Sequence, residues 1–375
     1  MKPIIKPVSR TLLMKELRDE FFLRETNRAG NEIYVVTAGE CPNVMKEIGR
    51  LREWAFRSAG GGTGEPYDID EEDLAPDGYK QLVVWDPVAK EIVGGYRFII
   101  CNSPEQKHLS TEHYFRFTDT FRKEYLPYAI ELGRSYVHPN YQSTRANAKS
   151  LYVMDNIWDG LGAIMVNNPD KKYFFGKVTM YGHYNVEARN MLMYFLHKHF
   201  PERGKLLEPI HPLELGINEE SMERLFTGED YAEDHKILLR ELKERGEFVP
   251  PMISSYMSVS PTMMVFSTVI NPDFGEVEET GIMITIPDMY PHKTERHTRG
   301  IERGVRPLRR LFDNTMIAID NVVTGRAASS VKVALRRRRT ERTRRVERGE
   351  KKGANSNNRT SRKANPTEVM EKKEQ

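Results

Sequence analysis

Cysteine and long hydrophobic runs are both scarce in this sequence of 375 residues. Two cysteines, Cys41 and Cys101, are too few for a disulfide framework or a structural zinc site, and neither has neighbours at metal-ligand spacing. The first thirty residues never place seven apolar residues together, and no later stretch reaches 18. Such a chain offers neither a signal-peptide core nor a membrane-spanning helix. We therefore expect a protein of the reducing cytoplasm, with at most a peripheral attachment to the inner face of the membrane.

The charge is distributed unevenly along the chain. The total is +3, but residues 336–375 hold 15 Lys and Arg against 6 Asp and Glu, a net charge of +9, so residues 1–335 carry a net charge of −6. Large apolar side chains are rare in the last forty residues, which predicts a disordered basic tail at 336–375. Residues 291–335 alternate apolar pairs with Arg at roughly helical spacing, which predicts an amphipathic basic helical segment.

Hydrophobic periodicity predicts one folded domain over residues 1–290. A helix is expected at 43–58, where apolar residues recur at helical spacing, and an Asp-Pro turn joins two strand patterns into a hairpin. A charged, mostly helical insertion is expected at 201–248. Further helices are expected at about 146–166 and 186–200, and strands at 79–86, 91–100, 128–137, 172–180, 262–270 and 281–288. This order predicts an α/β (α+β) fold whose mixed sheet is largely antiparallel.

Two charged residues interrupt one of the predicted strands, in the stretch LPYAIELGRSYVHPNYQ at 126–142. Glu131 and Arg134 would be costly in a buried strand unless each had a partner or a function. Positions three apart face opposite sides of a regular strand, so the two side chains converge only if the strand bulges, as the glycine at 133 suggests. A bulge would also direct a main-chain N–H toward the same space. A structural salt bridge to a neighbouring element would explain the two charges equally well.

Three further motifs accompany this stretch in a fixed order. Arg52 and Phe56 stand four apart in LREWAF, Asp70 and Asp73 stand in DIDEED, and Arg97 ends EIVGGYRF. This order resembles the acyl-homoserine-lactone synthases. It resembles more closely their relatives, the N-acyltransferases that make the lyso forms of ornithine and glycine lipids and other N-acyl amino acids. The resemblance extends over about residues 33–287 and includes ELGRSYVHPNYQ, FGKVTMYGHYNVEAR and PPMISSYMSVSPTMM.

The resemblance implies a GNAT-type fold and transfer of a long-chain fatty acyl group, with or without a 3-hydroxyl, to the α-amine of ornithine or glycine. The donor it implies is the acyl-phosphopantetheine of acyl carrier protein, with no bound cofactor and no metal. Glu131 would be the general base, directly or through a water, and Arg134, Arg97 and Arg52 would form ion pairs with Asp70 and Asp73. We also expect Arg97 or Arg52 to bind the carboxylate of the amino acid.

The sequence departs from related families in two places. Enzymes that use coenzyme A carry a Gly-rich loop at the start of the central helix, whereas this chain has QSTRANAKS, which favours a carrier-protein donor. An aromatic residue of the lactone synthases falls here in the run Gly60 to Gly62, which argues against lactone formation. Six basic residues could receive the acidic face of a carrier protein, although they could equally be ordinary solvated cations: Arg145, Lys149, Lys171, Lys172, Lys177 and Arg189.

The basic tail lacks a recognisable nucleic-acid-binding module beside it, so we expect it to meet an anionic membrane surface instead of nucleic acid. Two alternatives to the N-acyltransferase remain open at this point. One is a signal synthase that makes acylated lactones and consumes S-adenosylmethionine. The other is a non-catalytic protein that binds acyl carrier protein or lipid.

Overall fold

The computed structural model describes residues 1–142, 152–228 and 230–301 of the chain. These residues all belong to one compact unit. The predicted tail at 336–375 and most of the predicted basic segment at 291–335 lie outside the described residues. Within that segment the structure shows the helix α9 (Pro291–Thr298).

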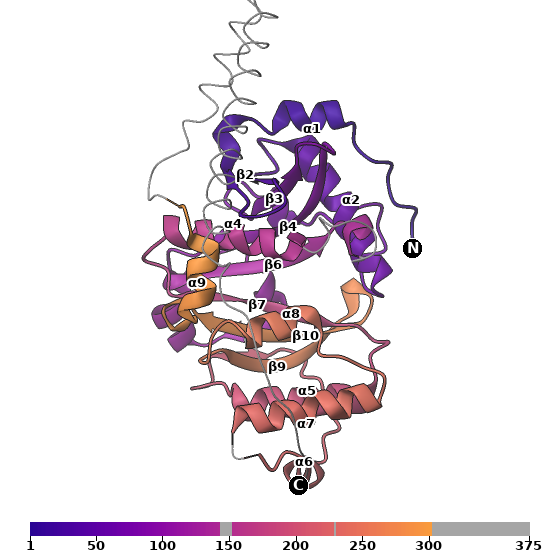
Figure 1. Cartoon of the computed structure of the whole chain (residues 1–375), viewed down its shortest axis with the longest axis vertical. Helices are drawn as coiled ribbons and strands as arrows, with labels where there is room; N and C mark the ends of the chain where they lie inside the picture. The colour runs from indigo at the N-terminus through magenta and orange to yellow at the C-terminus, as the bar shows by residue number, and fades with distance from the viewer. Residues whose placement is uncertain (143–151, 229, 302–375) are drawn as a thin grey trace, which may run out of the picture. The chain divides into compact units, whose positions relative to one another are not determined.

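An eight-stranded sheet forms the centre of the compact unit (Figure 1). Its strands follow the spatial order β1-β2-β3-β4-β6-β7-β10-β9, and every neighbouring pair is antiparallel except β6 with β7. The strands are β1 (Phe22–Glu25), β2 (Glu32–Val36), β3 (Lys80–Asp86), β4 (Glu91–Ile100), β6 (Ala129–Val137), β7 (Tyr173–Met180), β9 (Met264–Asn271) and β10 (Val277–Thr285). A smaller sheet pairs β5 (Phe115–Phe117) with β8 (Leu207–Pro209).

Helices cover both faces of the large sheet. On β3, Leu82 and Val84 belong to the core beneath α4 (Val153–Asn167) and α5 (Val186–His199), whereas Val83 belongs to the core beneath α2 (Pro42–Ser58). We refer to these sides as the α4 face and the α2 face. Figure 1 shows α7 (Tyr231–Glu244) beside α5 and α9 beside α4. The other helices are α1 (Arg10–Glu16), α3 (Glu71–Leu74), α6 (Glu219–Leu225) and α8 (Pro251–Met257).

The predicted fold class is confirmed, and most predicted elements are present within a few residues of their expected bounds. Of the helix predicted at about 146–166, the structure shows α4 from Val153, because residues 143–151 lie outside the described part. The sequence prediction missed α1 and the two strands β1 and β2. The stretch predicted as a helical insertion contains β8, α6 and α7.

The parallel pair β6 and β7 separates halfway along its length. Its register joins Ala129–Leu132 to Tyr173–Gly176 and then stops, although both strands continue. Beyond that point β6 stays paired with β4 and β7 with β10. The sheet therefore opens between two strands that are each held on their outer side.

Within the described ranges, no helix has both the length and the apolar character needed to cross a lipid bilayer.

Candidate active site

A cavity of about 790 Å³ lies where β6 and β7 separate. Residues 132–137 of β6 and 177–180 of β7 line it, and these begin where the pairing of the two strands stops. Tyr96 and Arg97 of β4 also line it. Since neighbouring residues of a strand point to opposite faces, a cavity that contacts both of them passes through the sheet. Its volume falls in the range typical of small-molecule sites.

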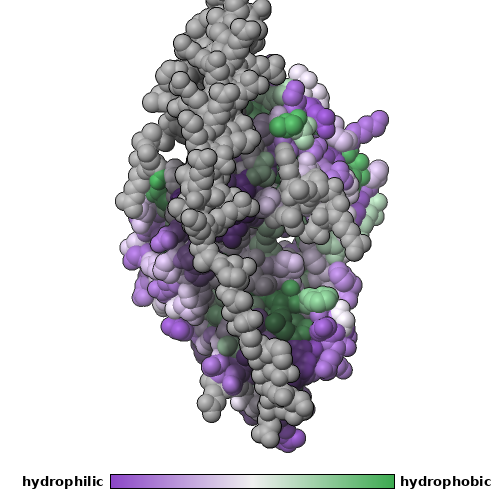
Figure 2. Space-filling view, in the orientation of Figure 1, coloured by the Kyte–Doolittle hydropathy of each residue, from purple (hydrophilic) through white to green (hydrophobic). Residues whose placement is uncertain are grey.

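The cavity wall on the α4 face is mostly apolar. Tyr96, Leu132 and Val178 belong to the core on that face, and they line the cavity together with Met252 and Tyr256 of α8. Figure 2 shows hydrophobic residues gathered on the surface at the level where Figure 1 places α8 and β10. This wall suits a hydrocarbon chain.

The cavity wall on the α2 face carries the charges. The charged side chains that line it include Arg97, Arg134, Lys177 and Glu279. Burial lowers the pKa of the Lys177 ammonium, and the nearby Glu279 and Glu131 only partly offset this effect. The Nζ of Lys177 donates to the Oγ of Ser110 at 3.2 Å. An apolar region and a charged region thus share one cavity.

The bulge predicted in β6 is confirmed, with one difference. Arg134 and Ser135 together stand opposite the single residue Tyr96 of β4. The left-handed backbone falls on Arg134, at a φ of 49°, instead of on the glycine before it. Gly133 instead leaves room for the Arg97 side chain, because a Cβ at position 133 would lie 3.3 Å from the Nε of Arg97. A non-glycine residue in the left-handed region is strained, and such strain is often found at functional sites.

Glu131 and Arg134 do not converge. The Glu131 side chain is wholly buried and does not line the cavity. Its carboxylate accepts hydrogen bonds from the Tyr79 hydroxyl at 2.6 Å, from the Thr111 main-chain N–H at 2.8 Å and from the hydroxyls of Thr111 and Ser110. Glu131 therefore reaches the cavity only through Ser110, and its predicted role as a base stays a prediction that requires a relay.

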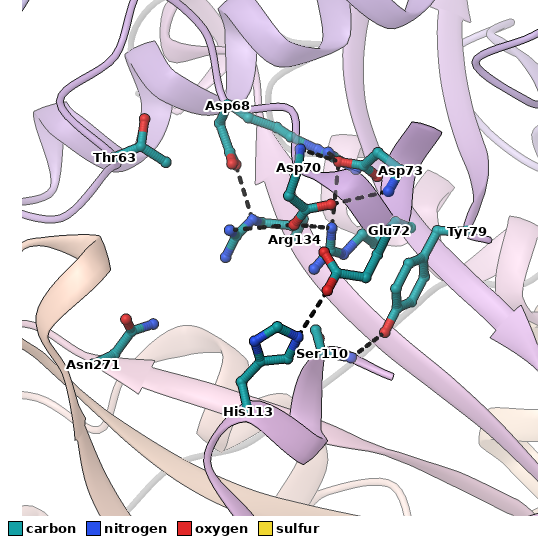
Figure 3. A network of polar contacts seen from close by, with 12 residues as sticks. Thr63, Asp68, Asp70, Glu72, Asp73, Tyr79, Ser110, His113, Arg134 and Asn271 are labelled. Atoms are coloured by element: carbon teal, nitrogen blue, oxygen red, sulfur yellow. Dashed lines mark hydrogen bonds and ion pairs between the residues drawn. The ribbon is translucent and has the colours of Figure 1, made fainter. Parts of the chain in front are cut away.

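The ion pairs predicted between the arginines and aspartates are present (Figure 3). Arg52 contacts Asp73 at 2.8 Å, and Arg97 contacts Asp70 at 2.6 Å and Asp73 at 3.3 Å. Asp70 caps α3, and Asp73 completes the capping box. Burial acts to raise the pKa of the Asp70 carboxyl, but Arg97 and Arg134 outweigh it and hold this pKa well below its usual range.

The same contacts decide between the two arginines that were expected to bind the substrate carboxylate. Arg52 is wholly buried, does not line the cavity and also donates to Gln81 at 2.5 Å, so this expectation is wrong for Arg52. Arg97 lines the cavity, but its guanidinium also lies 4.3 Å from the Tyr79 ring centroid.

Arg134 is more open to the cavity than Arg97. Its Nε lies 2.9 Å from the Asp68 carboxylate and its Nη2 lies 3.8 Å from Asp70. The guanidinium lies over the Phe274 ring at 4.4 Å, and that ring packs edge-on against Phe56, which also lines the cavity. Within the described residues, the Nη1 of Arg134 takes part in neither of the two ion pairs, so this atom can bind a ligand. The sequence prediction missed Asp68, whose carboxyl has a pKa raised by burial despite Arg134.

The six basic residues expected to meet a carrier protein do not form one surface. Arg145 and Lys149 lie outside the described residues. Lys172 is exposed, whereas Lys171 is buried and bonded to Asn102, Lys177 lines the cavity, and Arg189 is buried and paired with Glu278. The expectation of a docking role is therefore wrong for Lys171, Lys177 and Arg189.

Glu279 was not predicted as a site residue. It is 3% exposed, lines the cavity and stands on β10. The rule that singled out Glu131, a carboxylate inside an apolar strand, applies equally to VEETGIM at 277–283. Among the described residues, no group of three or more His, Cys, Asp and Glu side chains is placed to hold a metal ion.

Comparisons with known proteins agree with this geometry. Residues 51–151 match the acetyltransferase (GNAT) domain family, and the largely antiparallel sheet flanked by helices is consistent with a GNAT fold. Two curated proteins named glycine N(alpha)-acyltransferase, from Phocaeicola vulgatus and Bacteroides thetaiotaomicron, are each 51% identical over 302 residues. The match covers 79% of this chain, and 93% and 90% of those two proteins. The chain belongs to the acyltransferase family that these two proteins represent.

A solved structure, that of the CoA-dependent acyl-homoserine lactone synthase MesI, has 14% identity and a TM-score of 0.33 over 73% of this chain and 97% of that one.

Proposed function

We propose that this acyltransferase transfers a long-chain fatty acyl group from acyl carrier protein to the α-amine of glycine. The names of the two relatives support glycine as the acceptor over ornithine, which the sequence left open. The fatty acyl donor is supported by the resemblance of the sequence motifs and by the apolar cavity wall.

One observation carries the proposal: the cavity between β6 and β7 passes through the sheet, with an apolar wall on one face and charged groups on the other. A fatty acyl chain would lie along Tyr96, Met252 and Tyr256 on the α4 face. A small zwitterion would lie near Arg134 on the α2 face. The two reactants then meet in the gap, beside the bulge, which holds them together for reaction.

The reaction needs three things from the protein. The amine must lose a proton before it attacks, the thioester carbonyl must be polarised, and the two must be held in contact. A new C–N bond forms as the C–S bond breaks, and the proton from the amine ends on the departing thiolate. Main-chain N–H groups at the bulge would stabilise the oxyanion, and a cation such as Arg134 would bind the carboxylate of glycine.

A carrier protein as donor is supported by the sequence at the start of the central helix, which lacks the glycines of a pyrophosphate-binding loop. Of the basic residues that were expected to receive it, Lys172 is exposed in the structure, and Arg145 and Lys149 fall in the part of the chain that is not described. These three are therefore the ones to reverse in charge when the donor is tested.

The test is a comparison of purified full-length protein with two donors and two acceptors. Palmitoyl thioesters of acyl carrier protein and of coenzyme A are each supplied with glycine or ornithine, and products are identified by mass spectrometry. We expect N-palmitoylglycine from the carrier-protein thioester at a much higher rate than from any other combination. Acylation of ornithine alone, or consumption of added S-adenosylmethionine with lactone formation, would overturn the proposal.

A further inference from the structure

We infer that Glu279 is the carboxylate that holds the ammonium group of the acceptor and takes its proton before the amine attacks the thioester. This inference rests on the proposed function. It assigns the proton transfer to a residue of β10, which none of the sequence motifs singled out, in place of Glu131 of β6.

Glu279 is held in position from two neighbouring strands. In the register of β10 with β7 it stands opposite Thr179, and the Thr179 hydroxyl donates to its Oε2 at 3.2 Å. From β9, the side-chain amide of Asn271 donates to its Oε1 at 3.1 Å. Within the described part of the chain, each carboxylate oxygen thus accepts one hydrogen bond and can accept another. An ammonium group carries three N–H donors and can supply the missing bonds.

One cation of the protein, Lys177, stands near Glu279. Lys177 stands opposite Gly281, two residues further along β10, so its side chain is diagonal to Glu279 on the same face of the sheet. Within the described residues no ion pair joins the two side chains, although Lys177 is close enough for the charge of Glu279 to act on its pKa. The gap between them lies within the cavity that both residues line.

The charge of the Glu279 carboxylate also acts on two tyrosines. Burial, and then the charge of Glu279, raises the pKa of Tyr114 and of Tyr181 to about 12 each, so both hydroxyls stay protonated near neutral pH. Arg134 is a second cation that acts on both tyrosines. Figure 3 shows Asn271, the partner of Glu279, on a different segment of the chain from Asp68 and Arg134. A small amino acid with its carboxylate toward Arg134 and its ammonium toward Glu279 would be charge-matched at both ends.

Glu131 lacks these properties. Its carboxylate already accepts four hydrogen bonds from protein donors and does not line the cavity. A carboxylate that already accepts four hydrogen bonds has little capacity left to accept one from an ammonium group. Glu131 instead fixes Ser110, which in turn accepts from Lys177, so we assign it a positioning role.

The proposed step is balanced in atoms and charge. Glu279 takes one proton from the ammonium, and the free amine forms a C–N bond with the thioester carbonyl carbon. Glu279 releases this first proton to water and then takes the second proton that the nitrogen loses as it is acylated. The C–S bond breaks, and the second proton moves from Glu279 to the departing thiolate, so that one proton is released to solvent overall. The carboxylate is regenerated and no oxidant, metal or further reactant is needed.

The experiment compares two nucleophiles in Glu279→Gln, with whichever thioester donor supports turnover by the wild type. Glycine is an ammonium at neutral pH, whereas hydroxylamine is largely uncharged and needs no base before it attacks. We expect Glu279→Gln to lose about 10²–10⁴-fold in kcat/KM with glycine, the range for general bases. With hydroxylamine, measured above the rate without enzyme, the loss should be far smaller.

The pH profile and two further variants complete the test. The rate of Glu279→Gln with glycine should rise with pH in proportion to the free amine. Glu276→Gln is the matched control, since Glu276 is exposed before the start of the same strand, and it should behave as wild type with both nucleophiles. Glu279→Asp, which keeps the charge, should recover part of the activity with glycine.

Equal losses with both nucleophiles, or full activity of Glu279→Gln with glycine, would overturn the assignment. So would a Glu279→Gln protein that has lost both activities while Glu279→Asp recovers neither. Failure of the proposed function is separate, because it would appear as a wild-type protein that does not acylate glycine at all.

Discussion

At the scale of single residues, charge burial on the α2 face is the dominant feature. Arg52, Arg97 and Asp73 are each almost fully buried, and they hold one another in place beneath the cavity. Buried ion pairs contribute little net stability relative to apolar packing, but removing one member leaves an uncompensated charge. Since these buried ion pairs add little to the stability of the fold, we infer that the charges serve the function of the cavity.

Replacing Glu131 by Gln should destabilise the protein and lower its activity with every nucleophile. Four donors would lose a charged acceptor, at about 1.5–3 kcal/mol for a hydrogen bond to a charged group. Denaturant unfolding would measure the first effect, and transfer to glycine and to hydroxylamine the second. A variant of wild-type stability that lost only transfer to glycine would instead make Glu131 the base, acting through Ser110.

Replacing Arg134 by Gln should remove the preference of the enzyme for a carboxylate. The wild type is expected to favour glycine over glycinamide, which has the same amine but no negative charge. Loss of a charged hydrogen bond of about 1.5–3 kcal/mol corresponds to a KM for glycine that is roughly 10- to 100-fold higher. Glycinamide should be affected little.

Arg97→Lys is the comparison for this experiment, because Arg97 is the other cavity-lining arginine. If Arg97→Lys erased the preference for glycine while Arg134→Gln kept it, the carboxylate would bind to Arg97. Steady-state kinetics with the two acceptors distinguishes these outcomes.

Several of these residues were visible in the sequence because they break a pattern. Glu131 and Arg134 stand out as charges inside a strand, and the strand is present. Their partners could not be inferred, because Tyr79, Thr111 and Asp68 come from segments whose approach depends on the fold. The sequence alone does not show which face of the sheet a single lysine lies on. Lys177 was therefore expected on the surface, whereas it lines the cavity.

At the scale of elements, the short helix α3 links the charge network to the sheet. Its N-cap is Asp70 and its third residue is Asp73, and both side chains also hold arginines that belong to α2 and β4. The helix is four residues long, so it depends on these contacts and not on helical propensity.

Asp70→Asn should destabilise the protein in a pH-dependent way. The pKa of Asp70 is lowered in the folded state, so its stabilising effect is present above the unfolded pKa of about 4 and is lost as the pH falls further. Because Asn still caps a helix, the loss at neutral pH should reflect the charge, about 1.5–3 kcal/mol. The free energies of unfolding of the two proteins should converge below pH 4. A constant difference at every pH would contradict this account.

The elements that the sequence revealed are those with a strong local pattern. The helix α2 and the hairpin β3–β4 bury apolar side chains at regular spacing, so periodicity suffices. The strands β1 and β2 have four and five residues and include Glu25 and Glu32, so their pattern is too short to see. The separation of β6 from β7 is a property of two strands together and has no signature in either one.

At the scale of the whole molecule, the basic tail remains a prediction of the sequence. Each Lys or Arg near an anionic bilayer contributes about 1 kcal/mol to binding. We expect the full chain to bind anionic vesicles and a chain ending at Ala334 to bind them much more weakly, with unchanged turnover of soluble substrates. Co-sedimentation with vesicles at low and high salt would measure this. Equal binding by both chains would show that the tail is not responsible.

The central claim is that this chain makes acylated glycine. The most direct measurement is mass spectrometry of lipids from a host that lacks such lipids, grown with isotope-labelled glycine and expressing the wild type, Glu279→Gln or Glu276→Gln. The account predicts labelled N-acylglycine with the wild type and with Glu276→Gln, and little or none with Glu279→Gln. Absence of the label from the lipids of all three, or an acylated amino acid other than glycine in its place, would contradict it.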